Sequence, residues 1–294
     1  MKIIIEISFL MLMISLATSC SSDQDIVFDN EDIQMATLSL NVSQFEKSSF
    51  DAETRAEVAA SKVVSRLSLV LFSSDNTAVV DTVKARKNTD DADFGKFELK
   101  IPYGTYTMVI IGHNNNGDEV TVTPSSVTFS SNTVSDTFYA YQTITVSKDS
   151  QKTMNVVLNR AVARFRIIPT DAFPANIKDV TFKIEGGGVT LNPSTGLTTS
   201  KEVQNKTITA TSVAGKTSFV NTYAFMSSTD EESFTITVTA HDTDGNVINT
   251  RTFTNVKMQR NYSTNYTGSF FSDKESWEIT VEDGYTGNND VTFD

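Results

Sequence analysis

Apolar and polar side chains alternate with a period of two along most of the chain beyond residue 60, which is typical of half-buried β-strands. Residues 234–240 place apolar side chains on one face and threonines on the other. Asp244 and Gly245 then precede a second run at 247–253, and an Asp-Gly pair between two such runs predicts a β-hairpin. Similar runs occur at 66–72, 96–101, 106–111, 119–123, 143–146, 153–158, 163–168, 180–184 and 277–281.

The pattern predicts an all-β fold of short strands, as found in β-sandwiches and β-barrels. After the first twenty residues, no window of twelve residues fits an amphipathic helix, with the one possible exception of 53–66. A boundary is expected near residue 158, because a new alternating run opens at Asn159. The expected domains are therefore residues 20–158 and 159–294, each of about 135 residues and so of ordinary domain size.

Residues 1–19 have the features of a secretory signal peptide. Lys2 supplies a positive start, and residues 3–17 are apolar apart from Glu6 and two serines. This run is shorter than the about 20 apolar residues that a membrane-spanning helix needs, and no later segment could span a membrane. A buried N-terminal helix is the alternative interpretation.

Cys20 is the only cysteine, and it directly follows the signal. Residues 16–20 (Leu-Ala-Thr-Ser-Cys) resemble the end of a bacterial lipoprotein signal, and the acidic residues 21–25 resemble the tag that exports lipoproteins of the Bacteroidetes to the outer face of the outer membrane. The resemblance implies that Cys20 becomes the new N-terminus and carries acyl chains such as palmitate. Several acyl chains on one cysteine form a firm membrane anchor.

Composition and charge exclude several classes of function. The 294 residues include 24 Lys and Arg against 36 Asp and Glu, a formal net charge of −12, so the chain has no general attraction to nucleic-acid backbones. One cysteine excludes a disulfide framework and cysteine-based metal clusters, and two histidines leave little for a histidine-dependent metal site or catalyst. We expect no enzyme, no catalytic residue, no metal and no cofactor.

Two polar runs could carry chemistry, but each is also explained as a turn. His113 precedes Asn-Asn-Asn-Gly-Asp, a sequence suited to a turn as well as to a site. Residues 242–246 begin like a calcium loop, yet the twelfth position is Phe253 instead of Glu, and a hairpin explains every residue. An all-β hydrolase would need two carboxylates facing one cleft, which spacing neither establishes nor excludes.

The segment after the signal contains a strand and a polar connection. Ala36, Leu38, Leu40 and Val42 alternate with polar residues and predict the strand. The connection, residues 46–57, is polar and charged.

Arg55 and Ala56 lie in this connection, and an exposed arginine in a linker is a natural site of proteolysis. Cutting there would detach the first strand from the chain that follows and could leave an open groove. An ordinary linker is the alternative.

The C-terminus has features of a strand that could pair with another molecule. Trp277, Ile279 and Val281 alternate with polar residues, and glycines and asparagines then separate them from Val291 and Phe293. A terminal strand that detaches could add to the sheet of a neighbouring molecule through backbone hydrogen bonds. The alternative is the last strand of the second domain.

Several stretches resemble the fimbrillins of Bacteroidales, which are the subunits of type V pili together with their anchor and tip relatives. Besides the signal through Cys20, these stretches are residues 53–56, 101–106, 159–164 and 256–268. Their order and spacing extend over nearly the whole chain.

The resemblance implies two tandem transthyretin-like β-sandwich domains and export as a surface lipoprotein of the outer membrane. In polymerising subunits it also implies cleavage after Arg55 by an arginine-specific protease. Residues 31–43 would then fill the groove before the cut, and a strand near 277–281 or 291–293 would be donated to the next subunit. Anchor relatives keep the lipid and need no cut.

Two functions therefore stay open. The first is a structural and adhesive fimbrial subunit, of shaft, tip or anchor type, whose partners are other fimbrial subunits and a host or bacterial surface ligand. The second is a surface lipoprotein that binds a glycan or another ligand without polymerising. Exposed aromatic platforms would favour the second function.

Overall fold

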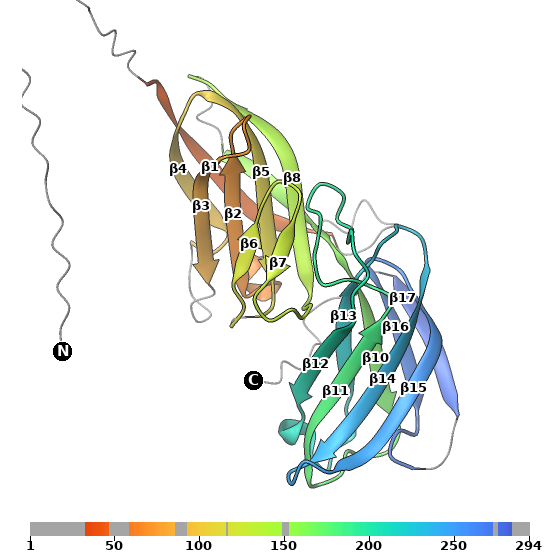
Figure 1. Cartoon of the computed structure of the whole chain (residues 1–294). Helices are drawn as coiled ribbons and strands as arrows, with labels where there is room; N and C mark the ends of the chain where they lie inside the picture. The colour runs from red at the N-terminus through yellow and green to blue at the C-terminus, as the bar shows by residue number, and fades with distance from the viewer. Residues whose placement is uncertain are drawn as a thin grey trace, which may run out of the picture. The chain divides into compact units, whose positions relative to one another are not determined.

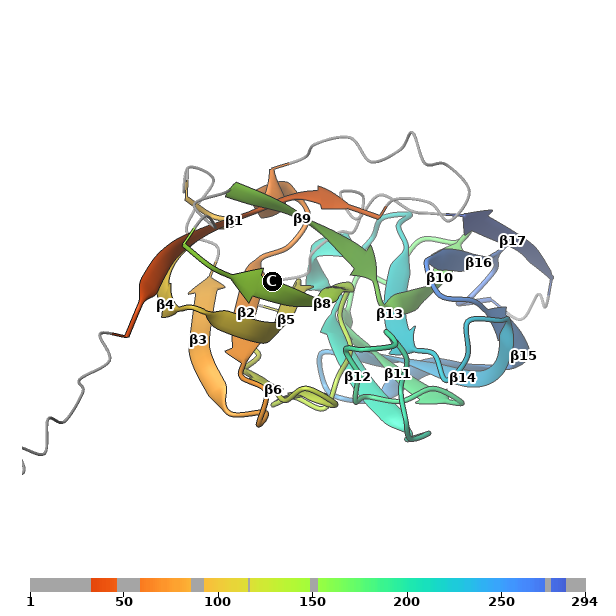
Figure 2. The same ribbon diagram turned by 90° about the horizontal axis from the view of Figure 1, so that it is seen from above.

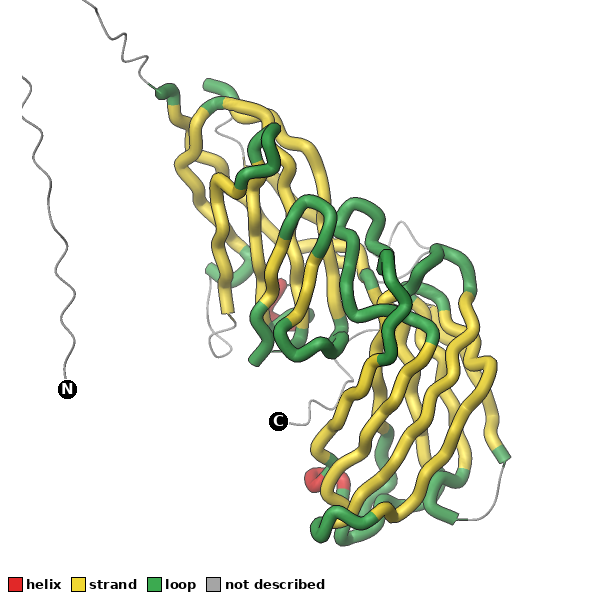
Figure 3. Tube along the Cα trace, in the orientation of Figure 1, coloured by secondary structure: helices red, strands yellow, loops and turns green. Residues whose placement is uncertain are grey.

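The computed structural model describes residues 33–46, 59–85, 93–115, 117–148, 153–272 and 276–283. Strands make up most of these residues (Figure 3), and their helical elements are two single 3-10 turns, η2 (Ala60–Lys62) and η3 (Thr211–Val213). The prediction of an all-β chain is therefore confirmed. By its internal contacts the chain divides into Met1–Ile33 and Gln34–Asp294, and every strand described below belongs to the second unit.

Seven strands between residues 35 and 160 form one hydrogen-bonded series in the order β3-β2-β5-β8-β9-β1-β4. Figure 1 shows β3, β2, β5 and β8 side by side. They are β1 (Met35–Phe45), β2 (Arg66–Phe72), β3 (Ala78–Ala85), β4 (Lys96–Pro102), β5 (Gly104–His113), β8 (Thr137–Val146) and β9 (Thr153–Arg160). Because β8 and β9 pair through only two residues each, the series folds there into two layers. Side chains of both layers, such as Leu69 of β2 and Leu40 of β1, share one core. We refer to residues 35–160 as the first lobe.

Eight strands between residues 162 and 283, the second lobe, form two four-stranded sheets in the orders β13-β10-β16-β17 and β12-β11-β14-β15. They are β10 (Val162–Pro169), β11 (Ile177–Glu185), β12 (Gln204–Thr209), β13 (Val220–Phe225), β14 (Glu232–Asp242), β15 (Val247–Met258), β16 (Tyr262–Gly268) and β17 (Trp277–Asp283). Phe165 of β10 and Phe182 of β11 are fully buried in the core of this lobe.

The hairpin predicted at Asp244 and Gly245 is confirmed, and it joins β14 to β15. Gly245 has a φ of +87°, which glycine adopts without steric cost. The Asp242 carboxylate accepts hydrogen bonds from the N–H groups of Asp244 (3.0 Å) and Asn246 (2.8 Å). The side chain of Asp242 therefore fixes the turn.

A third buried apolar cluster contains side chains of both lobes. The hairpin of β6 (Val120–Val122) and β7 (Val127–Phe129) takes part in it, and Phe129 stacks on Phe225 of β13 with ring centroids 5.8 Å apart. Val127 and Leu191 exchange backbone hydrogen bonds of 2.7 and 3.0 Å. An isolated antiparallel β-bridge between Val127 and Leu191 therefore accompanies the apolar contact between the lobes.

Polar side chains reinforce this contact. Gln204 of β12 accepts a hydrogen bond from the Val134 N–H at 2.7 Å, and Arg260 donates one to the Tyr139 hydroxyl at 3.1 Å. The strands of the first lobe end at Arg160, and those of the second begin at Val162. Whether the chain on either side of residue 158 folds as its own domain stays a prediction.

Candidate functional site

β1 contains the four apolar residues that were predicted to lie on one face of a strand. It runs antiparallel to β4 on one side and parallel to β9 on the other (Figure 2). Ala36, Leu38, Leu40 and Val42 are at most 7% exposed and belong to the first core. The predicted strand is therefore present, buried on one face and hydrogen-bonded along both edges.

The C-terminal end of β1 is fixed to β8 and to the C-terminal end of β9. Phe45 packs edge-to-face on Phe138, with ring centroids 5.3 Å apart. The Glu46 N–H donates to the Leu158 carbonyl at 2.8 Å, and the Glu46 carboxylate accepts from the Arg160 N–H at 3.1 Å. These contacts lie directly before residues 47–58, which are outside the described residues.

Loss of β1 would have a large energetic cost. Exposing a buried leucine such as Leu38 or Leu40 costs about 1.5–3 kcal/mol. The backbone groups of β4 and β9 that pair with β1 would also lose their partners, and buried backbone groups need such partners. If β1 is removed, the fold therefore requires another strand with the same alternation in its place.

β17 contains three of the residues predicted as a donor strand. It pairs with β16 over seven residues without a register shift and forms the edge of its sheet. Trp277 packs edge-to-face on Phe253, with ring centroids 5.0 Å apart, and is partly buried. Ile279 and Val281 are 55% and 58% exposed.

The remaining predicted site residues lie outside the described residues: Cys20, Arg55, Ala56, Val291 and Phe293. Lipidation, processing after Arg55 and donation of the last three residues therefore stay predictions. In the part of the chain that the structure describes, no helix is long and apolar enough to cross a membrane.

Sequence reasoning did not identify a buried ion pair between Arg160 and Asp136. Arg160 also donates to the Asn261 side-chain carbonyl at 3.2 Å, and its guanidinium lies 4.6 Å from the centre of the Phe138 ring. Arg160 is the last residue of β9, Asp136 directly precedes β8, and Asn261 lies in the turn before β16, so the bond from Arg160 to Asn261 joins the two lobes. No sequence motif marks such a pair, because its members are 24 residues apart.

His113, at the end of β5, is fully buried. The pKa of its imidazole is lowered to about 4, mainly by burial. The charge of Asp118 opposes this shift, and the charge of Arg66 adds a smaller lowering. The ring is therefore neutral at pH 7 and packs edge-to-face on Phe129 at 5.6 Å. Asp118 accepts hydrogen bonds from Ser130 and Ser131, which fixes the following turn. The turn interpretation explains these residues.

Residues 242–246, which begin like a calcium loop, form the turn of the hairpin between β14 and β15. Hydrogen bonds from Asn246 and Asp244 lower the pKa of the Asp242 carboxyl despite the opposing effect of desolvation, so its oxygens serve the turn. His241 Nδ1 lies 2.8 Å from an Asp179 carboxylate oxygen. Among the described residues, no group of three or more His, Cys, Asp or Glu is placed to hold a metal ion.

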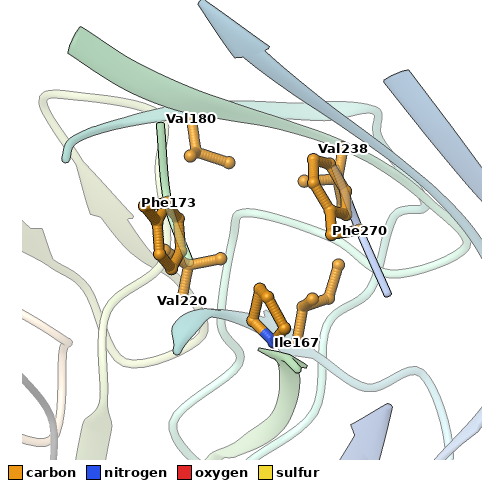
Figure 4. Close-up of a pocket in the computed structure, with 7 residues that line it drawn as sticks. Ile167, Phe173, Val180, Val220, Val238 and Phe270 are labelled. Atoms are coloured by element: carbon orange, nitrogen blue, oxygen red, sulfur yellow. The ribbon is translucent and has the colours of Figure 1, made fainter. Parts of the chain in front are cut away.

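A small hollow lies in the core of the second lobe (Figure 4). It has no room for a water molecule, and its lining has no titratable group. It is lined by Ile167, Pro169, Phe173, Val180, Val220, Val238 and Phe270. These features are those of imperfect packing and not of a ligand site.

Exposed aromatic residues, which would favour glycan binding, are few in the described ranges. Of the large apolar residues exposed there, Tyr141 is the one aromatic, at 38%. The others are aliphatic, and Val247, Ile279 and Val281 are each more than half exposed. In the described part of the chain, the exposed large apolar residues are therefore mostly β-branched and form no aromatic platform.

Two solved structures from Porphyromonas gingivalis are similar: the fimbrial anchor protein Mfa2 (13% identity, 85% of this chain and 99% of that chain covered, TM-score 0.42) and the tip fimbrial protein Mfa3 with C-terminal truncation (11%, 85% and 100%, TM-score 0.44). A search of curated protein sequences finds no match.

A protein-family model matches residues 30–286, which is most of the chain. It describes the fimbrillin-A associated anchor proteins Mfa1 and Mfa2. The match confirms the resemblance to fimbrillins. The family is one of structural and adhesive proteins, so the expectation of a non-enzymatic protein is confirmed as well. This chain belongs to the family of fimbrillin-A associated anchor proteins.

Proposed function

We propose that this protein is a fimbrial anchor, a surface lipoprotein attached to the outer membrane through lipidated Cys20. The match of the anchor-family model to residues 30–286 carries this proposal. In this role the chain contacts other fimbrial subunits and does not itself polymerise. A host or bacterial surface ligand is a further partner of the assembled fimbrium.

The proposal treats the two lobes as tandem transthyretin-like β-sandwich domains, residues 20–158 and 159–294, after a signal peptide of residues 1–19. The layered strands of each lobe and their separate cores support this division. The shared third cluster and the Arg160–Asp136 pair would keep the domains together under load.

An anchor keeps β1 in its own sheet. Burial of one face of β1 and its pairing with both β4 and β9 support a permanent position. The tether then joins the molecule through the N-terminal end of β1, because residues 21–34 separate Cys20 from Met35. A cut after Arg55 would be unnecessary.

The test is the N-terminus of the mature protein in outer membranes, read by mass spectrometry. The anchor function predicts an acylated Cys20, and Cys20→Ala should release the protein from the membrane. Arg55→Ala should change neither the mature N-terminus nor the amount at the surface. A mature N-terminus at Ala56, lost in Arg55→Ala, would overturn the proposal.

A polymerising shaft or tip subunit is the second candidate, because β1 directly precedes the connection that contains Arg55. In that case β1 leaves after the cut, and a C-terminal strand of the next subunit replaces it. Donation of Trp277, Ile279 and Val281 would require β17 to leave β16 and uncover Tyr266, which is 8% exposed. Val291 and Phe293 could be donated without that cost.

A glycan-binding lipoprotein that does not polymerise would share the acylated Cys20 and the intact Arg55. Binding of the purified protein to an array of surface glycans separates this function from that of an anchor. The anchor should instead co-purify with fimbrial subunits from cells, and Cys20→Ala should detach those subunits from the membrane.

A further inference from the structure

The five other edge strands of the three larger sheets differ from β17 in how they are protected against pairing. Natural edge strands usually carry lysines, prolines, bulges or a cover. β4 has two lysines and Pro102, and β12 has Lys206. β3 has Lys84 and a register shift in its pairing with β2, and β15 has two register shifts in its pairing with β14. All six residues of β13 are buried.

β17 lacks the first three of these protections, and the charged residues that it does carry, Glu278, Glu282 and Asp283, are all acidic. Its sequence, Trp-Glu-Ile-Thr-Val-Glu-Asp, contains no lysine, proline or glycine, and its pairing with β16 has no register shift. It is the last strand of its sheet in the part of the chain that the structure describes. Its β-branched centre has high β-propensity, so its free backbone edge is suited to a further strand.

The exposed apolar side chains of β17 lie on the face that should be covered. Ile279 pairs with Tyr266 and Val281 with Thr264, and directly paired residues share a face of the sheet. Tyr266 and Thr264 are 8% and 2% exposed, so this is the core face. Ile279 and Val281 are more than half exposed, and a strand added beside β17 would cover them with its own apolar residues.

The charges on the other face limit the partner. Glu278 and Glu282 are exposed, and Glu282 is 3.8 Å from Arg164. A two-fold antiparallel pairing of two copies that joins Ile279 to Val281 would also place Glu278 opposite Glu282, and like charges in opposite positions are destabilising. Lysine or arginine at those positions would be favourable.

We propose that the free edge of β17 binds an extended segment of a partner protein in which apolar residues alternate with lysine or arginine. Backbone hydrogen bonds would supply affinity, and the Ile279–Val281 face and the two glutamates would set register and orientation. The identification of the partner as a fimbrial subunit rests on the proposed function, whereas the edge chemistry does not.

The test uses the full mature chain and fluorescein-labelled peptides. Lys-Val-Lys-Ile-Lys-Val-Lys should bind, and amide hydrogen exchange should slow in 277–283. Glu-Val-Glu-Ile-Glu-Val-Glu, and Lys-Ser-Lys-Ser-Lys-Ser-Lys with the same charge but no apolar face, should each bind at least about tenfold more weakly. Fluorescence anisotropy measures these affinities.

Variants of the mature chain assign the peptide to the edge. The double variant Ile279→Lys/Val281→Lys should lose at least about tenfold in affinity, and Glu278→Gln/Glu282→Gln should reduce the preference for lysine over glutamate. Val247→Lys is the matched control, because Val247 is equally exposed (59%) on another strand. Equal binding of the Lys-Ser peptide, protection outside 277–283, or unchanged binding to the lysine double variant would overturn the proposal. None of these outcomes depends on lipidation or on fimbriae, so they are distinct from failure of the anchor function.

Discussion

Arg160 and Asp136 form a two-point ion pair at the junction of the lobes, with Nε 2.9 Å from Oδ1 and Nη2 3.1 Å from Oδ2. Both side chains are at most 2% exposed. Two parallel charge-assisted bonds fix the angle of the guanidinium as well as its position. The arginine can therefore also reach Asn261 of the second lobe.

Asp136→Ala should be strongly destabilising, because it leaves the Arg160 charge buried without its partner. We expect the free energy of unfolding in urea to fall by about 3–5 kcal/mol. Lys257→Ala, which removes an exposed ion pair with Glu231, should cost less than about 1 kcal/mol. The double variant Asp136→Leu/Arg160→Met should recover much of the loss. Equal costs for Asp136→Ala and Lys257→Ala would contradict this account.

The sequence predicted best those strands that have one buried and one solvated face. β14 is an example: Phe234, Ile236, Val238 and Ala240 are buried and the threonines between them are not. β13 was not predicted, because all six of its residues are buried, and Val-Asn-Thr-Tyr-Ala-Phe shows no alternation. Burial on both faces removes the pattern on which the prediction depends.

The contact between the lobes left a signal in the sequence that the alternating pattern alone does not reveal. Residues 69–72 and 108–111 are continuous apolar runs, and such runs indicate burial on both faces. Alternate residues of β2 and β5 do belong to the first core and to the third cluster. Which residues of the second lobe pack against these runs in the third cluster, by contrast, depends on tertiary structure.

Gly196 should be intolerant of substitution because of Tyr139. Its φ is +70°, and a Cβ there would overlap the Tyr139 hydroxyl, which also accepts a hydrogen bond from Arg260. Gly215 has nearly the same φ, +69°, but its Cβ would meet no atom within 4 Å. Gly215→Ala should cost about 1–2 kcal/mol from backbone strain alone.

Gly196→Ala should cost clearly more, and thermal unfolding of both variants measures the difference. The excess over Gly215→Ala reports the contact between the lobes. Tyr139→Ala, which removes the ring carbons Cζ and Cε1 as well as the hydroxyl that a Cβ at residue 196 would overlap, should reduce that excess. If the two alanine variants unfold at the same temperature, Gly196 does not pack against the first lobe as described.

Asp171 should make stability depend on pH. Burial alone would raise the pKa of its carboxyl. Hydrogen bonds from the Phe270 and Phe271 N–H groups and the Ser269 hydroxyl more than offset this effect, so the pKa lies below its ordinary value. A folded-state pKa below the unfolded one gives stability that is fully present above about pH 4 and is lost as pH falls through the folded pKa.

Asp171→Asn should therefore destabilise the protein at pH 7, by about 1–3 kcal/mol, and weaken the loss of stability on acidification. Urea unfolding at several pH values between about 2 and 7 measures both effects. Because Asp171 holds the loop before β17, amide exchange in 277–283 should also quicken. The exposed Glu231→Gln serves as control. A variant with the pH dependence of the natural protein would show that Asp171 contributes nothing in this way.

Leu40→Ala should show how firmly β1 is held. Leu40 is 1% exposed and lies in the core between the layers of the first lobe, so its truncation should cost about 2–5 kcal/mol. Val83→Ala, at a 48% exposed position of β3, should change stability by less than about 0.5 kcal/mol. Urea unfolding measures both variants, and amide exchange in the natural protein should be as slow in β1 as in β9. If Leu40→Ala costs no more than Val83→Ala, or if β1 exchanges much faster than β9, β1 is not a fixed part of the sheet, and a strand that leaves on processing becomes the better account.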